Sequence, residues 1–129
     1  MSGVKFLLDT NILIGLLSHN QTVTHLLATH RVNITECAYS AITRMELLSY
    51  HGLKEEDKKI IHHLLNRMQH FPINLDIEET TIAFRQRQKG KLPDAIIAAT
   101  AIQHQLKLLT LDAALSNKLA AYNAASGGL

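Results

Sequence analysis

An apolar run that stops at an acid constrains this chain most. Residues 4–8 read Val-Lys-Phe-Leu-Leu, which has the length and composition of a buried strand, and Asp9, Thr10 and Asn11 follow directly. A buried carboxylate is costly unless it is hydrogen-bonded, paired or bound to a cation. Asp9 therefore needs either a helix-capping role or a positive partner.

Apolar runs of strand length alternate with stretches of helical periodicity along the rest of the chain. Further strands are predicted within 34–42, at 71–75 and at 106–111. Helices are predicted at 12–17, 21–30, 43–50, 55–68, 76–88, 93–105 and 113–122, and a flexible tail at 124–129. The alternation predicts an α/β fold, a three-layer α/β/α domain with a central parallel sheet.

Bulk composition narrows the class of protein. With 129 residues and 47% hydrophobic content, the chain is predicted to form one domain over residues 1–129. Cys37 is the only cysteine, which suits a reducing cytoplasm, and Asp9 and Asn11 interrupt the apolar N-terminal stretch, so neither a signal peptide nor a membrane span is predicted. The net charge of +2 is compatible with a polyanionic partner.

Four of the eleven acids lack an ordinary surface explanation. Six acids fall at predicted helix starts, where the helix dipole favours them: Glu55, Glu56, Asp57, Asp76, Glu78 and Glu79. Glu36 lies in a polar stretch and is predicted to be on the surface. The remaining four have apolar neighbours: Asp9, Glu46, Asp94 and Asp112.

Each of these four acids has a structural explanation as well as a functional one. Asp9 and Asp112 could cap the helices that follow them, Glu46 could form a capping box with Thr43, and Asp94 could complement a helix dipole. However, Asp9 and Asp112 both end parallel strands at the carboxyl edge, where open α/β sheets bind ligands. The helices that carry Glu46 and Asp94 open toward the same edge, so the four acids are predicted to converge.

Converging carboxylates require a cation. Two like charges about 4 Å apart repel by roughly 4 kcal/mol at an effective dielectric near 20. An all-oxygen site without Cys or His ligands favours Mg²⁺ or Mn²⁺. Such an ion can orient and deprotonate water and neutralise the charge on a phosphodiester, so the pattern predicts nuclease chemistry.

Four segments of the chain resemble the successive motifs of PIN-domain ribonucleases, in particular VapC-type toxins of bacterial and archaeal toxin–antitoxin pairs. The segments are 7–11, 43–48, 92–101 and 109–112, and the resemblance covers essentially the whole chain in the family's order. It implies a five-stranded parallel sheet. It also implies an endoribonuclease dependent on Mg²⁺ or Mn²⁺ and acting on RNA phosphodiesters, with Asp9, Glu46, Asp94 and Asp112 as catalytic and metal-binding residues.

The resemblance extends to supporting residues and partners. Asp9 and Asp94 are the strongest choices for direct metal coordination, and Thr110 and Asn11 match polar residues that support the site. Family members usually form homodimers and are silenced by a small antitoxin protein that also binds operator DNA. The same partners are expected for this chain.

Five basic residues could contact the substrate. Arg85, Arg87, Lys89 and Lys91 could receive the RNA backbone, or could be ordinary cations at a helix end and in a solvated loop. Arg44 could contact phosphate or be a surface charge. The alternatives to a toxin are a PIN-like RNA-processing nuclease outside any toxin pair and a non-catalytic, Mg²⁺-binding receiver-like domain. A receiver needs a second acid adjacent to Asp9, which is missing.

Overall fold

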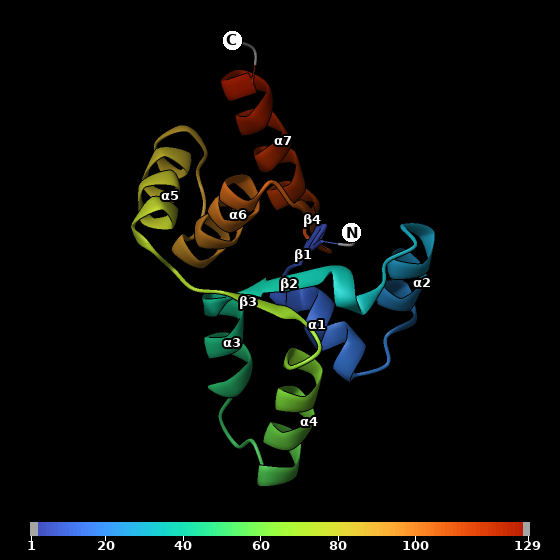
Figure 1. The fold of residues 1–129 in the computed structure, drawn as a ribbon. Helices are drawn as coiled ribbons and strands as arrows, with labels where there is room; N and C mark the ends of the chain where they lie inside the picture. Colours follow the sequence, from blue (N-terminus) through green and yellow to red (C-terminus); the bar gives the residue numbers. More distant parts are fainter. Residues whose placement is uncertain (1–2, 128–129) are drawn as a thin grey trace.

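The computed structural model describes residues 3–127, and across these residues four parallel strands form one sheet (Figure 1). The strands are β1 (Phe6–Leu8), β2 (Cys37–Ser40), β3 (Gln69–Phe71) and β4 (Lys107–Leu109). The helices are α1 (Thr10–Leu17), α2 (Gln21–Thr29), α3 (Ala41–Leu48), α4 (Glu55–Leu65), α5 (Leu75–Arg87), α6 (Leu92–His104) and α7 (Ala113–Gly127), and a 3₁₀ turn covers Ile34–Glu36.

Helices cover both faces of the sheet and make three layers, which confirms the predicted α/β/α fold class. Helices α1–α4 lie on one face and α5–α7 on the other (Figure 1). Successive strand residues alternate between these layers. Leu7 packs in the core beneath α5–α7, whereas Leu8 packs in the core beneath α1–α4, and both side chains are fully buried.

The strand order brings two distant strand ends together. The order is β3-β2-β1-β4, with Leu7 of β1 paired to Ala38 on one side and Leu108 on the other. From β1 the chain builds outward to β2 and β3, and then returns to add β4 on the opposite side of β1. The order reverses between β1 and β4, and open α/β sheets place their ligand crevice beyond the carboxyl ends of strands at such a point.

Three strands are shorter than the sequence predicts: β1 begins at Phe6 rather than at residue 4, and β3 and β4 have three residues each. The structure places β3 at Gln69–Phe71 because Asn74, expected in the strand, caps α5 by accepting a 2.9 Å hydrogen bond from Ile77 N. Strand β4 ends at Leu109 because Thr110 already belongs to the following turn, where its hydroxyl accepts from Asp112 N at 3.0 Å. The fifth strand implied by the family resemblance is not present within residues 3–127.

Several helix boundaries also differ from the prediction: α1 begins at Thr10, α3 ends at Leu48 and α4 ends at Leu65. Helix α3 begins at Ala41 because the Ser40 side chain caps it, accepting from Ile42 N at 3.3 Å. Helix α7 continues to Gly127, so residues 124–127 are helical where a flexible tail was predicted. Residues 128 and 129 of that predicted tail lie outside the described residues.

Two side chains have a different environment from the predicted one. Glu36 was predicted to be a free surface charge, but it is half-buried and forms a 2.9 Å ion pair with Lys5 Nζ. Ile60 has the apolar character of the buried residues of α4, but its side chain is 58% exposed. None of the helices within residues 3–127 is long and apolar enough to span a membrane.

Helices α1 and α2 approach closely at Gly15. A Cβ atom at this position would lie 2.9 Å from Val23 Cβ and in hard contact with one of the Val23 methyl groups. Both residues are buried. The missing side chain therefore sets the distance between these helices.

Candidate active site

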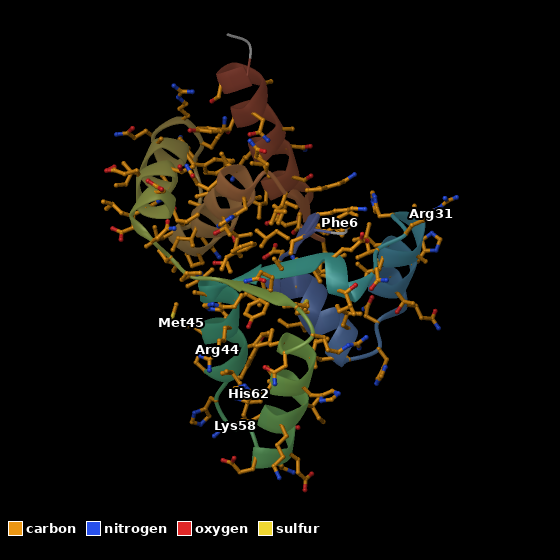
Figure 2. The ribbon with its side chains drawn as sticks, in the orientation of Figure 1. Phe6, Arg31, Arg44, Met45, Lys58 and His62 are labelled. Carbon is orange, nitrogen blue, oxygen red and sulfur yellow. The ribbon has the colours of Figure 1, made fainter. Side chains whose placement is uncertain are left out.

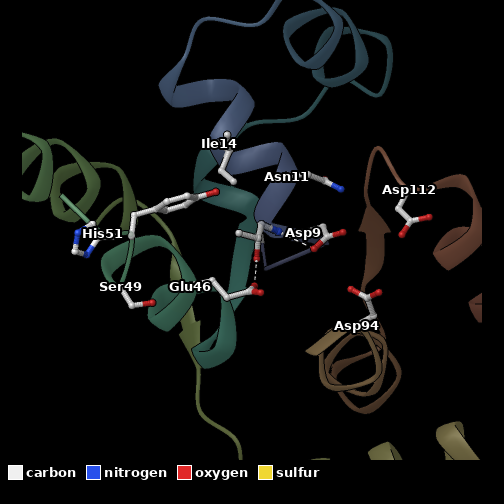
Figure 3. A pocket seen from close by; sticks show the side chains of 10 residues that line it. Asp9, Asn11, Ile14, Glu46, Ser49, His51, Asp94 and Asp112 are labelled. Carbon is white, nitrogen blue, oxygen red and sulfur yellow. Dashed lines mark hydrogen bonds between the residues drawn. The ribbon is translucent and has the colours of Figure 1, made fainter. Parts of the chain in front are cut away.

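The four singled-out acids line one pocket of about 570 Å³ at the carboxyl edge of the sheet (Figure 3). Asp9 follows β1, Glu46 lies on α3, Asp94 lies in the first turn of α6, and Asp112 precedes α7. The pocket lies at the reversal of strand order, beyond β1 and β4. Four segments far apart in the sequence thus contribute one carboxylate each.

Asp9 is the most buried of the four, with 5% of its surface exposed. Its Oδ1 accepts a 2.7 Å hydrogen bond from Thr10 N, and its Oδ2 accepts a 2.6 Å bond from Thr110 Oγ1. Burial raises the pKa of Asp9, the two hydrogen bonds lower it, and the charges of Asp94 and Glu46 raise it further. The raised pKa means that an ionised Asp9 disfavours the folded state unless a cation balances it.

Thr110 and Asn11, predicted to support the site, contact it in the structure. Thr110 has one hydroxyl hydrogen, which it donates to Asp9. Its oxygen accepts from Asn11 Nδ2 at 3.3 Å and from Asp112 N at 3.0 Å. Asn11 Oδ1 in turn accepts from Leu111 N at 3.2 Å, so Asn11 acts on Asp9 through Thr110.

Glu46 is not part of a capping box. The N-cap of α3 is Ser40, which makes Glu46 the sixth residue of the helix, too far along to reach the N-cap amide. Its half-buried carboxylate instead accepts a 2.7 Å hydrogen bond from Thr10 Oγ1. This bond links α3 to the start of α1 and leaves Glu46 facing the pocket (Figure 3).

Asp112 and Asp94 differ in whether the carboxylate accepts a hydrogen bond from the start of a helix. Asp112 Oδ1 accepts from Leu115 N at 3.1 Å, so this residue caps α7 as well as lining the pocket. Asp94 is half-buried in the first turn of α6, and its carboxylate accepts no hydrogen bond from residues 3–127. Among the described residues, the dipole of α6 is therefore the interaction that favours its charge.

The donor set fits a hard divalent ion. Within residues 3–127 no cation pairs with these acids, since the ion pairs there join Lys5 to Glu36 and Lys58 to Glu55. In the same span, no group of three Asp, Glu, His or Cys side chains lies close enough together to hold a metal ion. Mg²⁺ does not require such a group, because it keeps several waters and uses one or two carboxylates together with substrate phosphate oxygens.

The pocket also contains side chains that the sequence reasoning missed. Ser49, Tyr50 and His51 also line it. Ser49 and His51 lie on the side opposite Asp94 and Asp112 (Figure 3). Tyr50 follows Glu46 by four residues, but α3 ends at Leu48, so Tyr50 lies in the segment after the helix. Helical periodicity therefore could not have indicated Tyr50.

Some of the predicted basic residues lie beside the acids. Lys89 and Lys91 line a narrow cavity of about 20 Å³ that Asp94 and Asp112 also line. Lys118 of α7 lines it too, and the sequence reasoning missed this residue. Three lysines therefore line a cavity next to Asp94 and Asp112.

The predicted arginines lie outside the acidic pocket. Arg85 donates to Gly90 O at 3.4 Å, and Arg87 donates to Ser126 Oγ at 3.3 Å with its guanidinium 5.5 Å from the ring centroid of Tyr122. Arg44 is exposed on α3 (Figure 2) and does not line the pocket that contains Glu46. The three arginines are thus separated from the four acids.

Comparisons with solved structures find the same overall fold in other proteins. The chain is similar to the toxin-antitoxin complex from Klebsiella pneumoniae, with 37% identity, 84% of this chain and 87% of that chain covered, and a TM-score of 0.72. It is also similar to FitAcB from Neisseria gonorrhoeae, with 25% identity, 88% and 92% coverage and a TM-score of 0.73.

A third structure shares the fold at lower identity. VapBC2 from Rickettsia felis, bound to a DNA fragment from its promoter, is 19% identical, with 88% and 92% coverage and a TM-score of 0.72. No curated protein matches the chain. The family model of the PIN domain matches residues 6–119. The chain therefore belongs to the PIN domain family.

Proposed function

We propose that this protein is an endoribonuclease dependent on Mg²⁺ or Mn²⁺ and that it is the toxin of a type II toxin–antitoxin pair. The observation that carries the proposal is the convergence of Asp9, Glu46, Asp94 and Asp112 on one pocket with no cationic side chain paired to them. Membership of the PIN family replaces the receiver-like alternative. Similarity to a toxin-antitoxin complex at 37% identity supports the toxin assignment.

The chain's own residues have separate roles in this proposal. Asp9 and Asp94 would hold the ion directly, and Glu46 and Asp112 would hold it directly or through water. When bound, the ion supplies activation of water and neutralisation of phosphodiester charge. Thr110 keeps Asp9 in its acceptor form by donating a hydrogen bond to Oδ2.

The substrate would lie across the open pocket. Lys89, Lys91 and Lys118 give a positive rim beside Asp94 that attracts a phosphate backbone. On the opposite wall, the exposed side chains of Tyr50 and His51 offer rings to an unstacked base. These features suit a single-stranded RNA segment whose phosphate reaches the carboxylates.

We further propose that the protein acts in the cytoplasm as a homodimer and is silenced by an antitoxin. Induction of the chain alone should arrest growth, and co-expression of a small open reading frame beside its gene should relieve the arrest. If no such neighbour exists and induction is harmless, the RNA-processing alternative outside a toxin pair replaces the toxin assignment. Size-exclusion chromatography with light scattering tests the dimer.

Cleavage of RNA by the purified chain should require a divalent ion. Total RNA incubated with the chain and Mg²⁺ is expected to be cut at internal sites, EDTA is expected to stop the reaction, and excess Mg²⁺ should restore it. Denaturing gels give the readout. Asp94→Asn protein, purified in parallel, controls for a contaminating ribonuclease. Cleavage that persists in EDTA would contradict metal dependence.

Mn²⁺ alone should stabilise the folded chain. The raised pKa of Asp9 places a cost on its ionised form above that pKa, and a bound cation removes this cost. Mn²⁺ at one hundred times its Kd should add about 2.7 kcal/mol to the free energy of unfolding. Scanning calorimetry at pH 7 should therefore show a Tm several degrees higher with Mn²⁺. An equal rise in Asp94→Asn would place the ion elsewhere.

A further inference from the structure

Two threonines outside the acid set form a chain of hydrogen bonds that ends at Glu46. Thr10 Oγ1 lies 2.7 Å from Glu46 Oε1 and 2.9 Å from Thr43 Oγ1. Thr10 is the first residue of α1, whereas Thr43 and Glu46 lie three residues apart on α3 and so share a helix face. These hydrogen bonds therefore cross from α1 to α3 at the edge of the pocket, and the bond that reaches Glu46 is dashed in Figure 3.

The direction of these hydrogen bonds follows from counting hydrogens. A hydroxyl has one hydrogen, and a carboxylate only accepts. Thr10 donates its hydrogen to Glu46, so Thr43 must be the donor in the bond to Thr10. Thr43 is 0% exposed, so water does not compete for its hydroxyl. The bond from Thr43 fixes the rotamer in which Thr10 points its hydrogen at Glu46.

Thr10 also contacts a second acid of the pocket. Its backbone N–H donates to Asp9 Oδ1 at 2.7 Å, while its side chain holds Glu46. One residue thus contacts two carboxylates that come from different segments of the chain. Any rotation of Thr10 about its Cα–Cβ bond would release Glu46 without releasing Asp9.

We propose that Thr10, oriented by Thr43, is a positioning residue that sets the placement of Glu46 relative to Asp9 for the divalent ion. This inference rests on the proposed function, because it assumes that the two carboxylates serve one ion. Residues that orient metal ligands typically contribute 10- to 100-fold to metal affinity. The Thr10 hydroxyl should contribute within this range, and the Thr43 hydroxyl should contribute through it.

The test measures Mn²⁺ affinity by isothermal titration calorimetry without RNA. Thr10→Val is expected to raise the Kd by about 10- to 100-fold, and Thr43→Val is expected to raise it by a smaller factor. Thr10→Ser and Thr43→Ser keep the hydroxyls and should retain wild-type affinity. Thr81→Val is the matched control, because Thr81 is a buried threonine on α5 whose hydroxyl bonds only its own helix, to Ile77 O at 2.7 Å.

The double variant separates a relay from two independent effects. If Thr43 acts through Thr10, Thr10→Val/Thr43→Val binds Mn²⁺ no more weakly than Thr10→Val alone. Losses that multiply would overturn the relay, as would wild-type affinity in Thr10→Val. Urea unfolding of each variant verifies that the fold persists, and Mn²⁺ electron paramagnetic resonance gives a second readout of ion coordination.

The design distinguishes two kinds of failure. Asp94→Asn serves as the reference for the site itself. If Asp94→Asn binds Mn²⁺ as tightly as wild type, the proposed function and the inference both fail. If Asp94→Asn loses affinity but Thr10→Val does not, the metal site stands and the inference about Thr10 is wrong.

Discussion

Replacement of Asp94 by Asn is expected to lower the rate of RNA cleavage by more than about a hundredfold, because loss of a direct ligand exceeds the 10- to 100-fold effect of a supporting residue. The fold should persist. Asn has the same shape as Asp, and the Asp94 carboxylate accepts no hydrogen bond within residues 3–127. Loss of the favourable interaction between the Asp94 charge and the α6 dipole should lower the free energy of unfolding by about 0.3–1 kcal/mol.

A matched acid elsewhere makes this result specific. Asp76 lies in the first turn of α5, is exposed and does not line the pocket, so Asp76→Asn removes a comparable helix-start charge at a distance from the site. Initial rates on a defined RNA and urea unfolding curves should be measured for both variants. Full activity in Asp94→Asn, or equal losses in the two variants, would end the assignment of Asp94. Asp9→Asn should also abolish cleavage, although it additionally removes the acceptor of Thr110.

Gly15→Ala is expected to destabilise the chain by about 1–3 kcal/mol, the usual cost of inserting a methyl group into a packed contact. Alanine favours a helix over glycine by roughly 1 kcal/mol, so a simple propensity argument predicts the opposite sign. The difference arises because the new Cβ would lie 2.9 Å from Val23 Cβ. Chemical denaturation of the two proteins measures the change in the free energy of unfolding.

Val23 provides the internal check on this prediction. In Gly15→Ala/Val23→Ala the opposing methyl groups are gone, so the double variant should be more stable than the sum of the single effects predicts. Gly90→Ala is the control substitution, since a Cβ there would meet only Lys118 Nζ at an ordinary 3.7 Å. If Gly15→Ala is as stable as wild type, the close approach of α1 and α2 does not depend on Gly15.

That the acids line one pocket could be predicted because the ends of buried strands can be recognised in a sequence. The apolar run before Asp9 and the one before Asp112 both indicate buried parallel strands, and parallel strands end at the same edge. The order of the strands in the sheet could not be predicted from the sequence. The reversal between β1 and β4 that places Thr110 against Asp9 depends on long-range packing.

The choice between a capping role and a pocket role could not be made from the sequence. For Glu46 the capping box depended on where α3 begins, and Ser40 moves that start toward the N-terminus. For Asp112 the two roles are compatible, since one carboxylate oxygen caps α7 while the residue lines the pocket. Short local patterns fix neither outcome because helix starts shift by two or three residues without changing the apolar stripe.

The side chains that the sequence missed share a physical cause. Tyr50 and His51 follow the end of α3, and Lys118 lies on α7, so their proximity to the acids depends on how helices pack on the sheet. The Thr10 hydroxyl is similar, because its bond to Glu46 joins residues 36 positions apart. Such contacts leave no periodic signal in a single sequence.

Each helical layer contributes two of the four carboxylates: Asp9 and Glu46 belong with α1 and α3, and Asp94 and Asp112 with α6 and α7. Without a counterion, the like charges of these two pairs repel each other. This repulsion disfavours the close approach of α1 and α3 to α6 and α7. A cation bound in the pocket would remove this repulsion and hold the two helical layers together. Amide exchange around Glu46 on α3 and at the start of α6 should then slow in concert, even though these segments are far apart along the chain.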